Sequence, residues 1–251
     1  ASNYKNKIPI ILQEQNSFPG ITTRWFAKKS IKICVAFELK NFDSIGKVIH
    51  TGNPIRKGIT KGNKILGYKD FNFNKNYKTI FLFGGSQGSS YLNNLMREII
   101  KQISNASIQI IWQTGDNDFA NYKKFTSKNV FVTPFINNMA EAYAISDLII
   151  SRSGALTLSE ITVCGKPAIL IPFPYAAGDH QTKNAQVLAD SNAAKILYEK
   201  NLDTKTLMHT IMSLIHNEKV LSEMSEASKS MGKPNATAKI VDHILKEKND
   251  F

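Results

Sequence analysis

Short apolar segments alternate with amphipathic helical stretches along this 251-residue chain, and this alternation limits how it can fold more than any other feature. The clearest unit runs from an apolar strand at residues 79–83 (TIFLF), through the glycine-rich residues 84–89, into a helix at residues 90–103. Apolar residues recur in that helix at spacings of three and four, which is typical of a helix with one buried face. Strands and helices in this order predict a parallel sheet of the α/β class.

The alternation predicts one complete Rossmann-like domain of five or six strands over residues 57–232. Within it, residues 57–77 are rich in Gly, Asn and Lys, and we expect a linker or a surface excursion there. Residues 1–56 contain two or three more strands, too few for a stable half-sheet. We interpret them as the remnant of an N-terminal Rossmann-like domain, on which the final segment 233–251 docks as a crossing-back helix.

The formal charge is +12, from 32 Lys and Arg against 20 Asp and Glu. Basic residues form no block interleaved with aromatic residues, so a nucleic-acid partner is not favoured. The excess of basic residues has two equally good explanations, a biased base composition and a functional role. If the role is functional, an anionic membrane surface is the favoured partner. No apolar run reaches the ~18–20 residues that a membrane-spanning helix needs.

The glycine-rich loop predicts a phosphate contact. Gly84, Gly85 and Gly88 allow the backbone to approach a phosphate closely, Gln87 lies between them, and Ser86 would add a hydroxyl donor at the start of the helix. The loop matches neither the Walker nor the GxGxxG pattern, which weakens the case for nucleotide hydrolysis and dinucleotide binding. A tight strand-to-helix turn without a ligand is the alternative.

A second strand–turn–helix unit is formed by residues 148–160, which include RSGALTLSE at 152–160. Its helix start would offer free N–H groups and a positive dipole end to an anion. Glu160 would accept hydrogen bonds from a ribose diol, although a solvated helix residue is an equal alternative at this position. Two such loops at the carboxyl edge of one sheet favour a nucleotide-sugar pocket, because parallel sheets bind ligands at that edge.

Two further segments are candidates for the same edge. A backbone amide near Ile136 could contact a flat base, with a buried turn as the alternative. Gln181 could bind sugar hydroxyls with both the oxygen and the nitrogen of its side-chain amide. We find no paired glycosidase carboxylates, no metal-ligand spacing and no GxSxG serine. The sequence therefore predicts neither a metal nor a cofactor.

Several motifs together resemble the MurG family of glycosyltransferases. They are GGSQGS at 84–89, FINNMAEAYAISDLIISRSGALTLSE at 135–160, PFP at 172–174, DHQTKNA at 179–185, EQN at 14–16 with the following PGITTRWFAK, and GNPIR at 52–56. The resemblance implies a GT-B architecture, with two Rossmann-like domains and a site in the cleft between them. It also implies inverting, metal-independent transfer of GlcNAc from UDP-GlcNAc to lipid I, giving lipid II at the cytoplasmic face of the bacterial plasma membrane.

By matched position, the resemblance also implies roles for individual residues. Glu160 would bind the ribose, Ile136 the uracil and Gln181 the GlcNAc hydroxyls. Asn16 and Arg56 would reach the donor from the amino-terminal side. The diphosphate would be held by Ser86 and by the turn that Ala155, Leu156, Thr157, Leu158 and Ser159 form.

This sequence departs from the family pattern near its start. The two glycine-rich loops of the family's N-terminal domain are missing, and Gln13 stands where the family has a histidine. We therefore expect the proposed general base to be absent, and this chain alone to bind UDP-GlcNAc weakly and not to turn over. The alternatives are the UDP-sugar-binding half of a two-chain glycosyltransferase, another GT-B glycolipid glycosyltransferase, or a UDP-GlcNAc epimerase.

Overall fold

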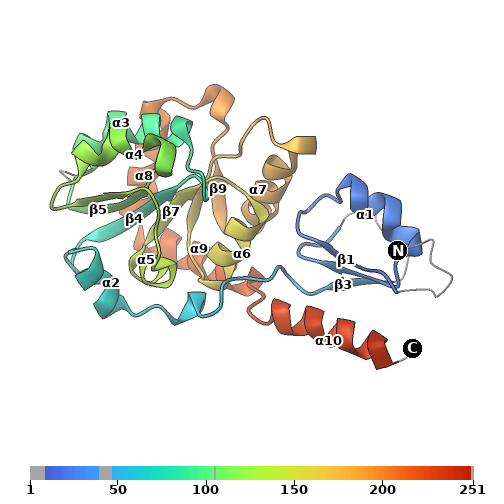
Figure 1. Cartoon of the computed structure of the whole chain (residues 1–251). Coiled ribbons are helices and arrows are strands. Elements are labelled where there is room, and N and C mark those ends of the chain that lie inside the picture. Colours follow the sequence, from blue (N-terminus) through green and yellow to red (C-terminus); the bar gives the residue numbers. More distant parts are fainter. Residues whose placement is uncertain (1–8, 40–46, 105, 250–251) are drawn as a thin grey trace. The chain divides into compact units, whose positions relative to one another are not determined.

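The computed structural model describes residues 9–39, 47–104 and 106–249, and its chain separates into two compact units (Figure 1). Unit 1 combines Ala1–Ile55 with Lys233–Phe251, and unit 2 is Arg56–Gly232. Each unit is described separately below. No helix among the described residues is long and apolar enough to span a membrane.

Unit 2 contains a six-stranded sheet in which every neighbouring pair is parallel. The prediction of a Rossmann-like α/β fold is therefore confirmed. The strands are β4 (Lys78–Phe83), β5 (Ile108–Gln113), β6 (Val130–Thr133), β7 (Leu148–Ser151), β8 (Ala168–Leu170) and β9 (Ala194–Ile196).

The strand order β6-β5-β4-β7-β8-β9 reverses direction between β4 and β7. The chain first builds outward from β4 to β6, and then returns to the other side of β4 and builds outward to β9. Loops that leave two such strands diverge to opposite sides, and this opens a crevice at the carboxyl edge where parallel sheets bind ligands. The loops after β4 and β7 are the two loops for which the sequence predicts contact with a ligand.

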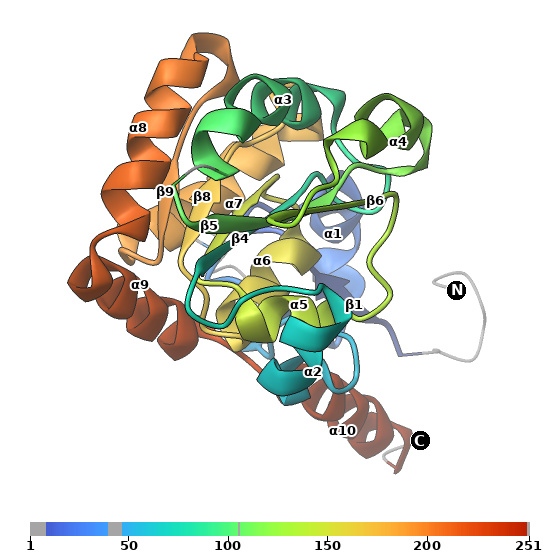
Figure 2. The same ribbon diagram turned by 90° about the vertical axis from the view of Figure 1, so that its left-hand side faces the viewer.

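Helices cover both faces of this sheet (Figure 2). Ile80 and Leu82 of β4 join the core formed with α3 and α8, whereas the rings of Phe81 and Phe83 contact Tyr143 of α5. Because side chains alternate along a strand, a strand that is apolar throughout needs both faces covered. The helices of the unit are α2 (Lys64–Asp70), α3 (Ser90–Ser104), α4 (Asp116–Tyr122), α5 (Met139–Ile145), α6 (Ala155–Val163), α7 (His180–Asp190), α8 (Thr204–Ile215) and α9 (Glu218–Met231).

Residues 57–77 are not a linker, and this part of the sequence prediction is wrong. They contain a short 3₁₀ helix and α2, whose N-cap Asn63 accepts hydrogen bonds from the N–H groups of Ile65 and Leu66. A Cβ at Gly67 would lie 2.7 Å from a methyl carbon of Ile145, so the absence of a side chain lets α2 pack against α5. Because α2 packs through a glycine and not through a row of apolar side chains, its sequence shows little apolar periodicity. The helix was not predicted for this reason.

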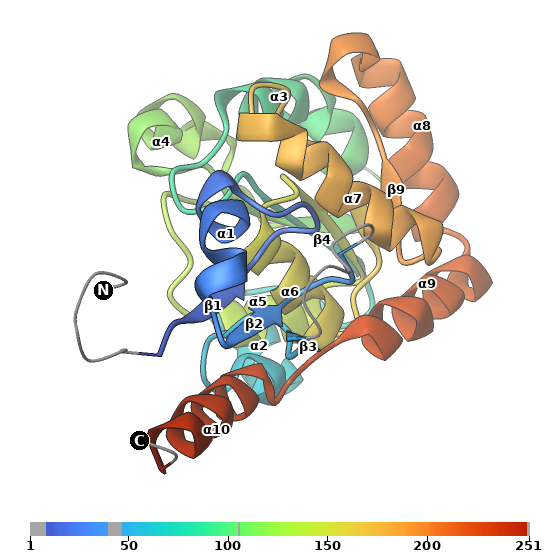
Figure 3. The ribbon, with the colours of Figure 1, turned by 90° about the vertical axis from the view of Figure 1, so that its right-hand side faces the viewer.

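Unit 1 has a three-stranded parallel sheet in the order β1-β2-β3, formed by Ile11–Glu14, Lys32–Val35 and Val48–His50. The helix α1 (Ile21–Phe26) connects the first two strands, as Figure 3 shows. The last helix of the chain, α10 (Ala236–Asn249), belongs to this unit. A Cβ at Gly52 would lie 2.4 Å from that of Lys233, so this glycine permits the close approach of the two segments.

Candidate functional site

The glycine-rich loop after β4 packs tightly against the end of β5. Gly85 and Gly88 have φ angles of 97° and 77°, which side chains other than glycine rarely adopt. A Cβ at Gly88 would lie 1.9 Å from the carbonyl oxygen of Thr114, and one at Gly115 would lie 2.2 Å from that of Gln87. The two chain segments therefore contact each other through their backbones, and this fixes the course of the loop.

The hydroxyl at the start of α3 is that of Ser89 and not that of Ser86, which corrects the sequence prediction. Ser86 is exposed in the loop, four residues before the helix begins at Ser90. Ser89 Oγ accepts hydrogen bonds from the backbone N–H of Leu92 at 3.4 Å and from Nε of Arg152 at 3.2 Å. Ser86 is thus left facing solvent, where its hydroxyl is accessible to a ligand.

The side chain of Arg152 connects the loops at this edge of the sheet through hydrogen bonds. Its Nη1 donates to the carbonyl oxygens of Ile171 and Pro172, both at 3.1 Å, and to Glu199 Oε2 at 2.6 Å. With Nε on Ser89, this buried guanidinium joins segments that follow β4, β7 and β8. The planar fork of arginine makes such a set of contacts possible. The carboxylate that this guanidinium binds is that of Glu199 in the same chain, not one supplied by a ligand.

The second loop leads into α6, whose first turn is open to a ligand. Residues 155–159 are the opening residues of this helix and not a turn before it, and its N-cap is Gly154. Among the described residues, no side chain caps the helix start. Ala155 and Leu158 are buried, whereas Leu156 is 51% exposed and Thr157 is half-buried. Uncapped N–H groups at the positive end of a nine-residue helix favour an anion there.

Glu160 is a buried carboxylate, which excludes the alternative of a solvated helix residue. It is 7% exposed, and its Oε2 accepts a long hydrogen bond of 3.4 Å from the hydroxyl of Tyr143. Burial raises the pKa of the Glu160 carboxyl, while the charge of Arg56 and the Tyr143 hydroxyl act in the opposite direction. Burial beside this carboxylate also raises the pKa of Tyr143 well above its ordinary value.

Arg56 and Glu160 form an ion pair, with 3.1 Å between Nε and Oε1. The Arg56 side chain is 49% exposed, against 10% for that of Glu160. Among the described residues, its terminal Nη groups have no partner, so they remain available to an anionic ligand. The structure thus brings together two residues that lie 104 positions apart and that the sequence had assigned to one donor site.

The predicted base-contacting residue, Ile136, is 3% exposed, and its backbone N–H is already used. That N–H donates to Oε1 of Gln113 at 3.0 Å, while Nε2 of Gln113 donates to the carbonyl oxygen of Gly85 at 3.0 Å. Gln113 was not identified from the sequence, because a polar residue at the end of an apolar strand carries no distinctive pattern. Phe135, the neighbour of Ile136, is 39% exposed.

Gln181 lies at the start of α7 and contacts the loop after β7. Its Oε1 accepts hydrogen bonds from the backbone N–H groups of Ser153 and Phe173, and its carbonyl oxygen accepts one from Ser153 Oγ. No described residue accepts a hydrogen bond from its amide nitrogen, which remains free to donate to a ligand hydroxyl. Gln181 therefore has one ligand-binding group available where the sequence suggested two.

Asn16 belongs to unit 1, and its role in donor binding stays a prediction. Its backbone N–H donates to Glu14 Oε1 at 3.0 Å. The buried Glu14 carboxylate also accepts hydrogen bonds from Gly20 N–H and Thr23 Oγ1, at 2.8 and 2.6 Å. Glu14 thus organises the turn that leads into α1.

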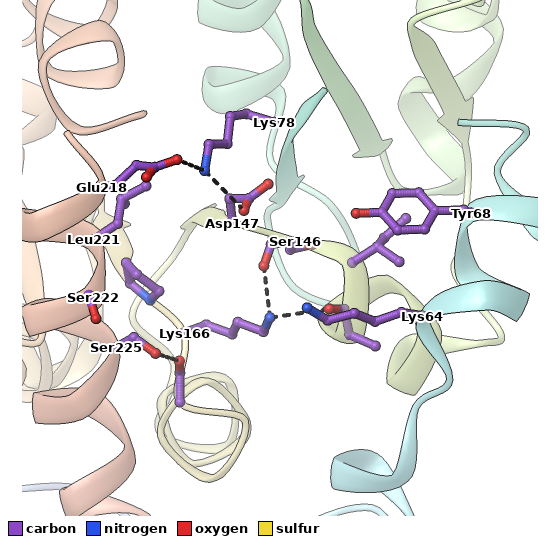
Figure 4. Close-up of a pocket in the computed structure, with 14 residues that line it drawn as sticks. Lys64, Tyr68, Lys78, Ser146, Asp147, Lys166, Glu218, Leu221, Ser222 and Ser225 are labelled. Atoms are coloured by element: carbon purple, nitrogen blue, oxygen red, sulfur yellow. Dashed lines mark hydrogen bonds and ion pairs between the residues drawn. The ribbon is translucent and has the colours of Figure 1, made fainter. Parts of the chain in front are cut away.

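Figure 4 shows a separate pocket of about 230 Å³ at the amino ends of the strands, the edge opposite to these loops. Nζ of Lys166 donates there to the carbonyl oxygens of Ser146 at 2.8 Å and Ala144 at 3.4 Å, at the end of α5. Burial, with the nearby charge of Lys64, lowers the pKa of Lys166 to about 8. The last carbonyls of α5 accept hydrogen bonds from this buried amino group, which accounts for the lysine without a ligand.

Within the described part of the chain, no group of three or more His, Cys, Asp or Glu side chains is placed to hold a metal ion. The polar groups described at the carboxyl edge are instead backbone N–H groups, hydroxyls, amides, the guanidinium groups of Arg56 and Arg152, and the carboxylates of Glu160 and Glu199. These are the groups that bind sugars, bases and phosphates directly. The fold, with the reversal of strand order at this edge, is that of a Rossmann-like α/β domain.

Comparison with known proteins identifies the family. The sequence profile of the glycosyltransferase family 28 C-terminal domain matches residues 79–240. The UDP-N-acetylglucosamine--N-acetylmuramyl-(pentapeptide) pyrophosphoryl-undecaprenol N-acetylglucosamine transferase of Flavobacterium psychrophilum is 42% identical over 95% of this chain and 66% of its own length. The transferase of the same name from Bacillus cytotoxicus is 37% identical, over 96% of this chain and 67% of its own.

The crystal structure of Acinetobacter baumannii MurG is similar with a TM-score of 0.77 and 31% identity, covering 95% of this chain and 68% of that one. The chain belongs to the MurG family of glycosyltransferases. It spans about two thirds of the length of the relatives that it matches.

Proposed function

We propose that this chain binds the UDP portion of UDP-GlcNAc at the carboxyl edge of the six-stranded sheet. The observation that carries the proposal is the buried Glu160 carboxylate, held by Arg56 and Tyr143 beside the point where the strand order reverses. A carboxylate can accept hydrogen bonds from both hydroxyls of a ribose. The burial of Glu160 makes such hydrogen bonds stronger than they would be in water.

The surrounding groups suit the rest of the nucleotide sugar. The glycine-rich loop with Ser86, the uncapped start of α6 and the free Nη groups of Arg56 would neutralise the diphosphate. The amide nitrogen of Gln181 would donate to a hydroxyl of GlcNAc. Because the N–H of Ile136 is used by Gln113, contact with uracil would come from the rest of that loop, including the exposed ring of Phe135.

Family membership extends the proposal to the reaction. We infer that this donor site, together with a complete acceptor domain, serves the transfer of GlcNAc from UDP-GlcNAc to lipid I, with inversion, to form lipid II; this chain alone is expected not to turn over. As the acceptor hydroxyl attacks the anomeric carbon, negative charge develops on the departing diphosphate. Backbone N–H groups at the start of α6, together with Arg56, would stabilise that charge without a metal ion.

A titration of UDP-GlcNAc into the wild type and the Glu160→Gln variant tests the donor site. Loss of a charge-assisted hydrogen bond predicts an affinity that is about tenfold to a hundredfold weaker. Glu218→Gln is the matched control, because it makes the same chemical change at the amino edge, where Glu218 pairs with Lys78. Equal affinity of the wild type and Glu160→Gln would rule out the assignment of Glu160 to the ribose.

We also propose that unit 1 contacts an anionic membrane surface, where a lipid-linked acceptor resides. Trp25 and Ile21 on α1 are 71% and 55% exposed, and Arg24, Lys28 and Lys29 lie beside them in the sequence. An exposed indole with neighbouring basic groups suits the interface of an anionic bilayer. Flotation with vesicles of anionic phospholipid should recover the wild type and lose Trp25→Glu; equal recovery of both would contradict the proposal.

A further inference from the structure

Gln113 is a buried polar side chain that connects two loops of the proposed donor site. It is the last residue of β5 and only 3% exposed. Nε2 donates to the carbonyl oxygen of Gly85 in the loop after β4, and Oε1 accepts from the N–H of Ile136 in the loop after β6. Both distances are 3.0 Å, so the amide is satisfied on both sides.

The two partners fix the orientation of this amide. A carbonyl oxygen requires a donor and an N–H requires an acceptor, so glutamine fits in one orientation. An ionised glutamate would accept from Ile136 but would have no proton to donate to Gly85. A buried amide that loses either partner carries a cost of desolvation without compensation.

The backbone contact between Gly88 and Thr114 holds the end of this loop, and Gly85 lies outside that contact. Apart from its chain neighbours, no described residue has an atom within 4 Å of the position that a Cβ of Gly85 would occupy. Its carbonyl oxygen accepts from Gln113 and from the N–H of Gly88, a residue of the same loop. The bond from Gln113 therefore ties this part of the loop to the sheet.

We propose that Gln113 is a positioning residue that sets the spacing between the phosphate-binding loop and the base-binding loop for a nucleoside diphosphate. The inference rests on the proposed donor site and adds to it a residue that does not itself touch the ligand. A site that is held in its binding geometry before the ligand arrives loses less conformational entropy on binding. Release of the tether therefore weakens binding even when the residues that contact the ligand are intact.

Gln113→Met tests this role, with UDP as the probe and Gln109→Met as the matched control. Gln109 is a buried glutamine on the same strand, 1% exposed, and its amide contacts Asn74 and Thr79 at the far end. Both variants lose a buried amide, so both should lower the urea midpoint of unfolding. Gln113→Met alone should weaken UDP binding at least about tenfold and speed hydrogen exchange at the amide of Ile136.

Gln113→Glu gives a second test that does not depend on the stability of the methionine variant. A protonated carboxyl group supplies one donor and one acceptor, as glutamine does. Burial raises the pKa of such a carboxyl, so acidification from about pH 8 to about pH 5 should restore the tether. The ratio of the UDP dissociation constants of this variant and the wild type should fall toward one over that range.

The outcomes separate the two proposals. A wild type that does not bind UDP removes the proposed function and this inference together. A wild type that binds UDP, with Gln113→Met or Gln113→Glu binding equally well at about pH 8, removes only the role of Gln113. A UDP affinity lowered equally in Gln109→Met and Gln113→Met would show a general loss of stability, and this too would overturn the inference.

Discussion

Substitution of Gly88 by alanine should damage both the fold and the donor site, through two effects that can be separated. The first is conformational, because a φ of 77° costs a residue with a Cβ roughly 1–2 kcal/mol. The second is steric, since the new Cβ would lie 1.9 Å from the carbonyl oxygen of Thr114 and 2.6 Å from its carbon. Backbone atoms cannot rotate away, so the glycine-rich loop would have to move.

Gly58 provides the control for the conformational effect. Its φ is 81°, and apart from its chain neighbours no residue that the structure describes has an atom within 4 Å of the position of its Cβ. Gly58→Ala should therefore lose about 1–2 kcal/mol of unfolding free energy. Gly88→Ala should lose about 1–3 kcal/mol more, the range in which inserted atoms destabilise a well-packed region. Urea unfolding followed by circular dichroism measures both values.

The affinity for UDP gives the functional half of this prediction. If the glycine-rich loop binds phosphate, its displacement from Thr114 should weaken UDP binding in Gly88→Ala at least about tenfold. Gly58→Ala should bind UDP as the wild type does. Equal unfolding free energies for the two variants would refute the steric argument, and unchanged UDP affinity in Gly88→Ala would refute the role of the loop.

Three further predictions concern buried polar groups. Tyr143→Phe should raise the pKa of Glu160 and weaken UDP-GlcNAc binding a few-fold, with stability changed by about 1 kcal/mol; an unchanged dissociation constant would contradict it. Arg152→Lys should cost about 2 kcal/mol or more in urea unfolding, since lysine cannot replace the fork on Glu199; wild-type stability would show that the fork is dispensable. For Lys166 the pKa is about 8 when folded and 10.5 when unfolded, so the unfolded state binds more protons between these values. The unfolding free energy of the wild type should therefore rise relative to that of Lys166→Met by up to about 3 kcal/mol as the pH increases from about 8 to about 10.5. Curves of unfolding free energy against pH that run parallel for the two proteins would contradict this prediction.

The sheet and most of the candidate site were predictable from sequence because they depend on local patterns. Apolar strands that end in glycine-rich turns indicated the loops after β4 and β7, and the structure places both at the point where the strand order reverses. The motifs that resemble MurG then supplied Glu160 and Arg56, whose ion pair no pattern of neighbouring residues could show.

Other features were missed because they depend on packing between distant segments. Helix α2 exposes its apolar residues Ile65 and Leu66 and packs against α5 through a single glycine, Gly67. The start of α3 at Ser90 was predicted correctly, but its hydroxyl was assigned to Ser86, because the sequence does not show which serine of the loop accepts a hydrogen bond from the first turn of the helix. Gln113 became visible only when three strands and their loops were placed side by side.

A crystal structure with bound UDP tests the central claim most directly. We predict that the ribose hydroxyls will lie within hydrogen-bond distance of Glu160. The phosphates should contact the start of α6 and the loop that contains Ser86. Density for UDP at the amino edge of the sheet, for example in the pocket beside Lys166, would contradict this account, as would a ribose remote from Glu160.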